Sequence, residues 1–315
     1  MSLSYWKSLL LREIHVYKGF FKGSAGKESR KFVLNHLKGN FDKAKKIIFK
    51  QHLKRRKTLK FEFHLTTHCN LNCKCCDTFS SIAPDGFTPL EQVKNDVNRL
   101  KEISDDKIDT LILAGGEPLL HPHLSEIMNI IGINLPEVPN KQIITNAVLL
   151  QQQDDDFWTS CKKNNFKLFI TKYPINLPYD KITEKAKEKG VDLEFYGITG
   201  SSLKNMRKIP INIEGSENAK NSFKKCTRAN NCITLKDGKF YTCSLIPRID
   251  IFNNFFSKNL IVSDNDYIDL YQAKNIEEIL GFLCKPVSFC RYCSTSKPVF
   301  GLAWEKTKKS LDEWI

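Results

Sequence analysis

The sequence has 315 residues, of which 41% are hydrophobic and 27% are charged, and its formal net charge is +14. This composition is typical of a globular protein and excludes disorder along the whole chain. The excess charge lies in residues 1–60, which hold 17 basic and three acidic side chains and leave 32 of each elsewhere. Because the rest of the chain is balanced, the sequence argues against a nucleic-acid-binding protein with a uniformly basic surface.

Residues 1–58 are predicted to form a basic helical extension. Apolar residues recur on one helical face between Trp6 and Phe21, and a second helical stretch runs from Phe32 to Leu53. No apolar run approaches the roughly 20 residues that span a bilayer, and no secretion signal is evident. We therefore expect a cytoplasmic protein. The extension has two alternative roles: peripheral contact with the inner face of an anionic membrane, or packing on the body of the protein.

From residue 60 onward, short apolar runs alternate with helix-length amphipathic stretches. A helix over 89–103 is predicted to begin with a capping box, in which Thr88 is the N-cap and Glu91 its partner. This alternation predicts right-handed βαβ units and a parallel sheet, which residues 208–213 join if they form a sixth strand. The other predicted strands are 61–65, 110–114, 142–145, 167–171 and 192–196, and the helices between them are 123–132, 155–164 and 180–189.

The loop after the first strand carries Cys69, Cys73 and Cys76 in the spacing C-x3-C-x2-C. Three thiolates on one short loop can hold three irons of a [4Fe-4S] cluster and leave the fourth iron open to a ligand. A structural zinc site is the alternative, with Cys75 or His68 as its fourth ligand.

The second strand runs directly into Gly115, Gly116, Glu117 and Pro118. Two glycines at a strand end allow a ligand to approach the backbone closely. Glu117 adds a carboxylate that can accept a hydrogen bond from an ammonium group.

Together these motifs make residues 60–200 resemble the core of the radical S-adenosylmethionine (radical SAM) superfamily, a partial (βα)6 barrel of the α/β class. The resemblance implies that Cys69, Cys73 and Cys76 hold the catalytic [4Fe-4S] cluster and that S-adenosylmethionine chelates its open iron. It also implies that Gly115 to Pro118 hold the amino group of S-adenosylmethionine. The turn formed by Thr145, Asn146 and Ala147 resembles the superfamily's TNG turn beside the cofactor, with alanine in place of glycine.

The chemistry implied by this resemblance is reductive cleavage of S-adenosylmethionine to methionine and a 5′-deoxyadenosyl radical, which removes hydrogen from a substrate. We accordingly expect a flavodoxin or ferredoxin-type protein as electron donor.

A second set of cysteines follows residue 217, where the strand-helix alternation stops. Residues 236–239 predict the turn of a β-hairpin whose second strand leads to Cys243. With Cys226, Cys290 and Cys293, this thiol forms a closed four-thiolate site suited to a [4Fe-4S] cluster or to zinc. The spacing resembles the twitch half of the SPASM module, which implies one auxiliary [4Fe-4S] cluster. Cys232 and Cys284 are either substitutes among the ligands or buried thiols.

Three domains are therefore predicted: the extension 1–58, a radical SAM core over 59–216, and a small hairpin and helix module over 217–315. Resemblance to twitch enzymes favours a small polar or glycan-type substrate, such as a sugar or nucleotide-sugar, which is oxidised or epimerised. Peptide crosslinking is the main alternative, and a zinc-stabilised binding protein is the non-enzymatic one.

Further candidates lie near the predicted strand ends. Lys172 and Tyr173 are candidates for substrate contact, because parallel barrels place functional groups at the carboxyl ends of strands. His121 and His123 are either metal ligands or loop residues. Glu194 and Tyr196 share one face of the fifth strand.

Overall fold

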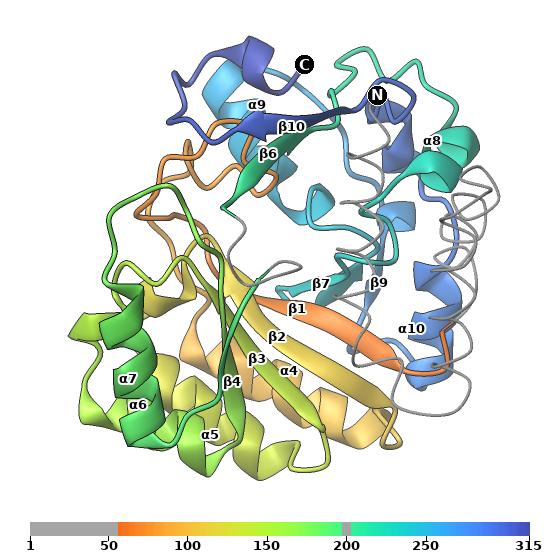
Figure 1. The fold of residues 1–315 in the computed structure, drawn as a ribbon. Coiled ribbons are helices and arrows are strands. Elements are labelled where there is room, and N and C mark those ends of the chain that lie inside the picture. The colour runs from red at the N-terminus through yellow and green to blue at the C-terminus, as the bar shows by residue number, and fades with distance from the viewer. Residues whose placement is uncertain (1–55, 197–202) are drawn as a thin grey trace, which may run out of the picture.

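The structure is a computed structural model that describes residues 56–196 and 203–315 (Figure 1). The helices expected in residues 1–55, and the membrane contact expected of them, lie outside the described residues and stay predictions. Within the described residues, none of the helices has the length and apolar character needed to cross a membrane.

Five parallel strands form the centre of the fold, and helices connect them in the predicted alternation. This confirms the α/β class and the parallel sheet expected from the sequence. The strands lie in the order in which they occur in the chain: β1 (Leu59–Thr66), β2 (Ile108–Gly115), β3 (Asn140–Thr145), β4 (Phe166–Ile170) and β5 (Leu193–Phe195). The helices are α4 (Leu90–Ile103), α5 (Leu124–Asn134), α6 (Asp155–Lys163) and α7 (Tyr179–Lys189).

The two faces of this sheet differ in chemistry because side chains alternate along each strand. Figure 1 shows α4 to α7 on one face, where they cover the main hydrophobic core. On β1 the residues that enter this core are Leu59, Phe61, Phe63 and Leu65. The intervening residues Lys60, Glu62 and His64 therefore lie on the opposite face, toward the C-terminal part of the chain.

The predicted sixth strand does not join this sheet. Residues 208–213 lie outside it, and β6 (Asn205–Lys208) pairs antiparallel with β10 (Val299–Ala303) in a separate two-stranded sheet. The place beside β1 is taken by β7 (Thr234–Lys236), which runs parallel to β1 and pairs Leu235 with Phe63. A (βα)6 arrangement is thus replaced by five βα strands extended from the other edge.

The hairpin predicted around residues 236–239 is present. β7 pairs antiparallel with β8 (Lys239–Tyr241), which pairs in turn with β9 (Tyr267–Asp269) to complete an eight-stranded sheet. Asp237 and Gly238 both have positive φ angles, 50° and 70°. Two left-handed residues in a two-residue hairpin loop are the geometry that an Asp-Gly pair favours.

The predicted capping box of α4 is wrong, although the helix itself is confirmed. The helix begins after Pro89 without a side-chain cap. The Thr88 hydroxyl instead donates to the carbonyl oxygen of His64 at 2.8 Å, and the Thr88 N–H bonds to Leu65. Pairing with β1 holds Thr88 away from the first turn of the helix.

The C-terminal elements form a second hydrophobic cluster on the other side of the sheet. It includes Phe79 from the loop after β1, Phe252, Phe289 and Trp314. The remaining helices are α8 (Ala219–Lys225), α9 (Ile249–Phe256) and α10 (Ile276–Leu283). Short 3-10 turns cover Pro118–Leu120, Leu150–Gln152, Ile246–Arg248, Asp264–Asp266, Ser288–Tyr292 and Leu311–Glu313.

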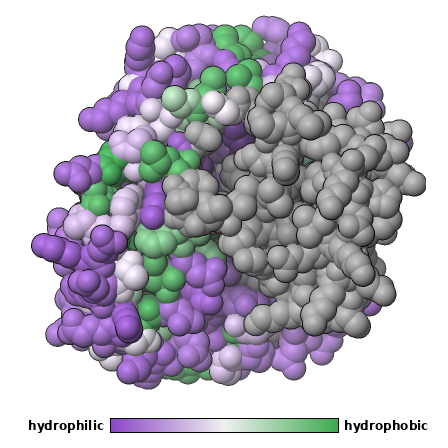
Figure 2. All heavy atoms as spheres, in the orientation of Figure 1, coloured by the Kyte–Doolittle hydropathy of each residue, from purple (hydrophilic) through white to green (hydrophobic). Residues whose placement is uncertain are grey.

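The described surface on the side shown in Figure 2 is mainly hydrophilic, with hydrophobic side chains in scattered areas. The polar surface over the helices is expected for helices whose apolar stripes are buried against a sheet.

Candidate metal centres

The loop after β1 brings the three cysteines of the first set together. Burial is the main cause that raises the pKa of Cys69, and the neighbouring charges of Glu117, Cys76 and Cys73 raise it further. Cys76 also raises the pKa of Cys73, again after burial. The three thiols are thus within electrostatic reach of one another, and three cysteines on one loop are a donor set that suits a cluster held by three thiolates.

The end of β2 fixes this loop through its backbone. The N–H of Gly116 donates to the Thr66 carbonyl oxygen at 2.7 Å, and the N–H of Glu117 donates to that of His68 at 3.1 Å. A Cβ atom on Gly116 would lie 1.8 Å from the His68 carbonyl oxygen. The glycine is therefore required by the close approach of the cysteine loop itself, a reason that the sequence-based interpretation did not include.

Glu117 has partners other than the ammonium group that the sequence suggested. Its side chain is 1% exposed. The Thr145 hydroxyl donates to Oε1 at 2.6 Å, the Leu119 N–H donates to the same oxygen at 3.2 Å, and the Asn146 N–H donates to Oε2 at 2.9 Å. Burial raises the pKa of Glu117 to about 7, while these three hydrogen bonds lower it. The carboxyl group thus joins the ends of β2 and β3.

The turn after β3 contacts the cysteine loop directly. Asn146 Nδ2 lies 3.6 Å from Cys69 Sγ and donates to Asn70 Oδ1 at 2.7 Å. Ala147 has a φ angle of +66°. This left-handed conformation favours glycine, so the alanine at this position keeps the turn at a local cost of roughly 1–2 kcal/mol.

A segment near the C-terminus holds the opposite side of the loop. Trp304 Nε1 donates to Cys73 Sγ at 3.2 Å, and its ring contacts Tyr173 with the centroids 5.8 Å apart. The Lys74 N–H donates to the carbonyl oxygen of Glu305 at 3.0 Å. Tyr173, a candidate for substrate contact, has a side-chain hydrogen bond with Cys73, and its substrate role stays a prediction. The sequence contained no signal for Trp304, because 231 positions separate it from Cys73.

Cys75 and His68, the alternative fourth ligands, have different surroundings from the three cysteines. Cys75 is buried with a φ angle of +54°, and its nearest charged groups include Lys208 and Glu313. His68 Nδ1 accepts a hydrogen bond from the Gly86 N–H at 3.2 Å. Among the described residues, no group of three or more His, Cys, Asp or Glu side chains is already placed to hold a metal ion.

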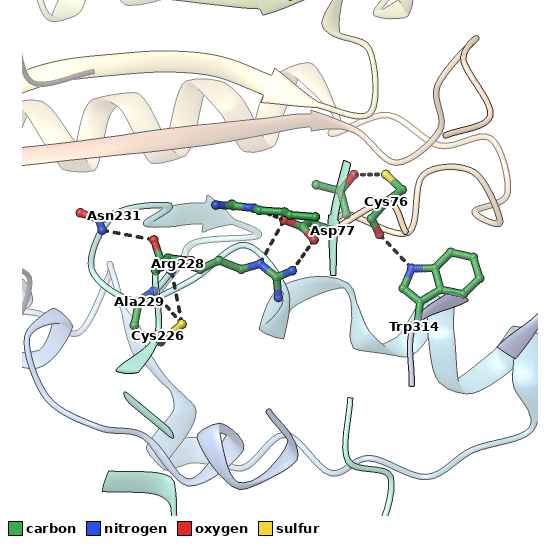
Figure 3. Close-up of polar contacts among 10 residues, drawn as sticks. Cys76, Asp77, Cys226, Arg228, Ala229, Asn231 and Trp314 are labelled. Carbon is green, nitrogen blue, oxygen red and sulfur yellow. Dashed lines mark hydrogen bonds and ion pairs between the residues drawn. The ribbon is translucent and has the colours of Figure 1, made fainter. Parts of the chain in front are cut away.

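The second set of cysteines also converges. Burial raises the pKa of Cys243 to about 11, with the Cys226 thiol as the next cause. Burial is likewise the largest cause that raises the pKa values of Cys290 and Cys293, and both also experience Cys226 and Cys243. The four predicted thiols are thus within electrostatic reach of one another. The N–H groups of Arg228 and Ala229 both lie 3.3 Å from Cys226 Sγ, as hydrogen-bond donors to a sulfur (Figure 3).

Three further cysteines have the following surroundings. Burial raises the pKa of Cys232 to about 12, and its charged neighbours include Glu62, Arg207 and Asp77. Cys284 ends α10 and interacts with the Gly281 carbonyl oxygen. Cys161 is fully buried in the main core, which confirms its predicted packing role.

The other candidate residues have structural partners. His121 contacts the Thr88 carbonyl oxygen through Nε2 and accepts from the His123 N–H through Nδ1. Lys172 lies over the ring of Phe195 at 4.0 Å. Glu194 pairs with Lys167 at 3.0 Å, and the Tyr196 N–H donates to the carbonyl oxygen of Ile170.

Comparison with known proteins gives one family match. Residues 63–177 match the family model described as the radical SAM superfamily. No curated protein sequence matches the chain.

Three solved structures illustrate the structural likenesses. BtrN in complex with AdoMet and 2-DOIA is 14% identical, with a TM-score of 0.48 over 76% of this chain and 94% of that one. anSMEcpe with AdoMet and the Cp18Cys peptide is 16% identical, with a TM-score of 0.35 over 44% of this chain and 42% of that one. Streptococcus suis SuiB bound to S-adenosylmethionine is 14% identical, with a TM-score of 0.34 over 50% and 37%.

The contact at Gly116 predicts a strong effect of one methyl group. We expect Gly116→Ala to lower the free energy of unfolding by about 2–3 kcal/mol, because the His68 carbonyl oxygen moves only with the cysteine loop. Chemical denaturation measures this change. Gly281→Ala in α10 is the matched control, since its Cβ would meet nothing within 4 Å, and it should stabilise by up to about 1 kcal/mol. Equal stability of Gly116→Ala and the wild type would contradict the argument.

Glu117 predicts a dependence of stability on pH. Its pKa is about 7 in the folded chain, against 4.5 for an unperturbed glutamate. The folded state therefore holds a proton that the unfolded state releases, and this contribution to stability is lost as pH rises from 4.5 through 7. The loss amounts to about 3 kcal/mol at 1.36 kcal/mol per pH unit.

Between pH 4.5 and pH 7.5, we expect the unfolding free energy of the wild type to fall by that amount relative to that of Glu117→Gln. Denaturation of the metal-free protein measures both values. Glu91→Gln, at a carboxylate that is 74% exposed, is the control. Parallel curves for wild type and Glu117→Gln would show that Glu117 is ionised throughout the range.

Proposed function

We propose that the chain is a radical SAM enzyme acting on a small polar substrate, such as a sugar or nucleotide-sugar, because residues 63–177 match the radical SAM superfamily model. Hydrogen abstraction leads in this proposal to oxidation or epimerisation. The observation that carries the proposal is the position of Cys69, Cys73 and Cys76 on one loop, which backbone contacts hold on both sides.

The residues of this loop would hold the catalytic [4Fe-4S] cluster through their three thiolates. When bound, the cluster and S-adenosylmethionine supply reductive cleavage of the sulfonium and hydrogen abstraction by the resulting 5′-deoxyadenosyl radical. The chain's part is to hold the thiols and to exclude water. Asn146 and Trp304 direct N–H groups at the sulfurs of Cys69 and Cys73, which stabilises negative charge there.

The turn from Gly115 to Pro118, with Thr145 and Asn146, remains our proposed site for S-adenosylmethionine. Its backbone groups are the ones we propose as contacts for the amino group, because both oxygens of the Glu117 side chain already have protein partners.

For Cys226, Cys243, Cys290 and Cys293 we propose one auxiliary [4Fe-4S] cluster. The electrostatic interaction among these four thiols supports a shared site, and two N–H groups donate to Cys226 Sγ. The electron needed at the catalytic cluster comes, in this proposal, from a flavodoxin or ferredoxin-type donor.

The polar face of the sheet supports a polar substrate. Glu62 and Lys60 on β1 and Lys167 with Glu194 on β4 and β5 carry charge on the face opposite the helices. Arg248 contacts the same face through His64. It is fully buried, and it donates to His64 Nδ1 at 3.1 Å and to the Ser244 carbonyl oxygen at 2.6 Å. A substrate with several hydroxyl groups has hydrogen-bonding partners on such a face.

Anaerobic reconstitution tests the cluster assignments. We expect about eight irons per chain, the content of two four-iron clusters, and 5′-deoxyadenosine on reduction with S-adenosylmethionine. Cys73→Ala should remove about half the iron and abolish 5′-deoxyadenosine, whereas Cys75→Ala on the same loop should retain both. Cys290→Ala should remove the other half, with Cys284→Ala as its control. A colourless protein that binds zinc and forms no 5′-deoxyadenosine contradicts the proposal.

Substrate class is tested by isotope transfer. A deuterated sugar or nucleotide-sugar that is the substrate transfers deuterium into 5′-deoxyadenosine, which mass spectrometry detects. Transfer from a peptide instead, with none from the sugars, supports the peptide-modifying alternative.

A further inference from the structure

An ion pair links the two cysteine sets. Asp77 directly follows Cys76 in the first loop, and Arg228 lies two residues after Cys226 of the second set. Arg228 Nε donates to Asp77 Oδ2 at 3.0 Å, and its Nη2 bonds to Oδ1 of the same carboxylate. Figure 3 shows the guanidinium reaching from the segment of Cys226 to the loop of Cys76.

The same arginine contacts both sets with different groups. Its backbone N–H donates to Cys226 Sγ at 3.3 Å, while its side chain holds the residue after Cys76. The Arg228 side chain is 4% exposed, and the Asp77 side chain 24%. A bidentate pair with so little access to water has a fixed geometry and is weakly screened by salt.

The loop around Cys76 is held at other points as well. The Thr78 hydroxyl lies 3.2 Å from Cys76 Sγ, and Trp314 Nε1 donates to the Cys76 carbonyl oxygen at 3.1 Å. Removing the ion pair therefore leaves anchors for the loop, so that the charge of Arg228 can be changed with limited loss of structure.

The charge of Arg228 reaches the second set. Cys293 and Cys243 both have Arg228 among their charged neighbours. Arg207 also pairs with Asp77, at 3.4 Å, but only Arg228 combines a two-bond contact with this carboxylate and a backbone hydrogen bond to Cys226 Sγ. The reduction potential of an iron-sulfur cluster depends on the charge around it, and a nearby cation favours the added electron.

We propose that the Asp77–Arg228 ion pair fixes the two centres relative to each other, and that the positive charge of Arg228 sets the reduction potential of the auxiliary centre. This inference rests on the function proposed above, because it requires a redox cluster at the second set. Asp77 and Arg228 are positioning residues in this proposal and ligate no metal.

The experiment is a redox titration of the reconstituted full chain, with the auxiliary cluster followed by electron paramagnetic resonance. Arg228→Gln should lower the ratio of reduced to oxidised auxiliary cluster about tenfold at a fixed potential, equivalent to a 59 mV shift for one electron. Asp77→Asn should shift the ratio in the opposite direction, because it removes a negative charge. Arg228→Lys, which keeps the charge, should stay near the wild type.

Two further variants control for structure. Arg207→Gln removes a cation from the same carboxylate and should change the ratio less than Arg228→Gln does. The double variant Asp77→Asn with Arg228→Gln removes both charges without leaving a buried charge unpaired, so it preserves the test where Arg228→Gln alone does not fold. Its ratio should return toward that of the wild type.

The outcomes separate this inference from the proposed function. Suppose that the wild type holds two clusters. If the ratio of reduced to oxidised auxiliary cluster is then the same in all variants, or if Arg228→Gln and Asp77→Asn shift it in one direction, the inference is overturned and the proposed enzyme stays intact. A wild-type protein with only one four-iron cluster overturns the auxiliary centre and this inference together.

Discussion

The contact between Gly116 and the cysteine loop is the constraint on which the first centre depends. Two backbones approach so closely there that a methyl group on Gly116 would lie 1.8 Å from the His68 carbonyl oxygen. This approach allows the N–H groups of Gly116 and Glu117 to bond to the segment just before Cys69. The carboxyl group of Glu117 then ties the same turn to β3, so that one tetrapeptide joins two parallel strands and the loop with the thiols.

The C-terminal part of the chain completes this environment from the other side. Trp304 and Glu305 contact the loop near Cys73, and Trp314 contacts it near Cys76. β7 of the same C-terminal part also extends the sheet beside β1. The first cysteine loop therefore has its contacts from two parts of the chain, and its geometry depends on both.

Local patterns were sufficient for strands β1 to β5, helices α4 to α7 and the cysteine motifs. The apolar periodicity of residues 90–103 reflects a buried stripe that is present in α4, and the Asp237-Gly238 pair forms the expected turn. The capping box failed because Thr88 bonds to β1, a partner that no local pattern contains. For the same reason the replacement of the sixth strand by β7, the contact of Trp304 and the Asp77–Arg228 pair were not predictable: each joins segments more than 100 positions apart.

The charge count of the sequence also conceals how charge is arranged. Outside residues 1–60 acidic and basic side chains are equal in number, yet Arg228 and Arg248 are buried close to the cysteines. Burial lowers the pKa of Arg248, whereas the neighbouring Glu62, Cys76 and Cys243 raise it. Burial likewise raises the pKa values of thiols in both sets, so that ionisation of the thiols is costly without a positive partner.

Metal binding requires thiolates and releases their protons, so each ionised cysteine adds a negative charge to this interior. Arg228 and Arg248 are then placed to offset part of that charge, while Asp77 and Glu62 limit the positive excess when the thiols are protonated. A buried arginine with one carboxylate partner is thus compatible with both states of the site. A balanced residue count in the sequence thus conceals buried arginines and carboxylates that lie close to the cysteines.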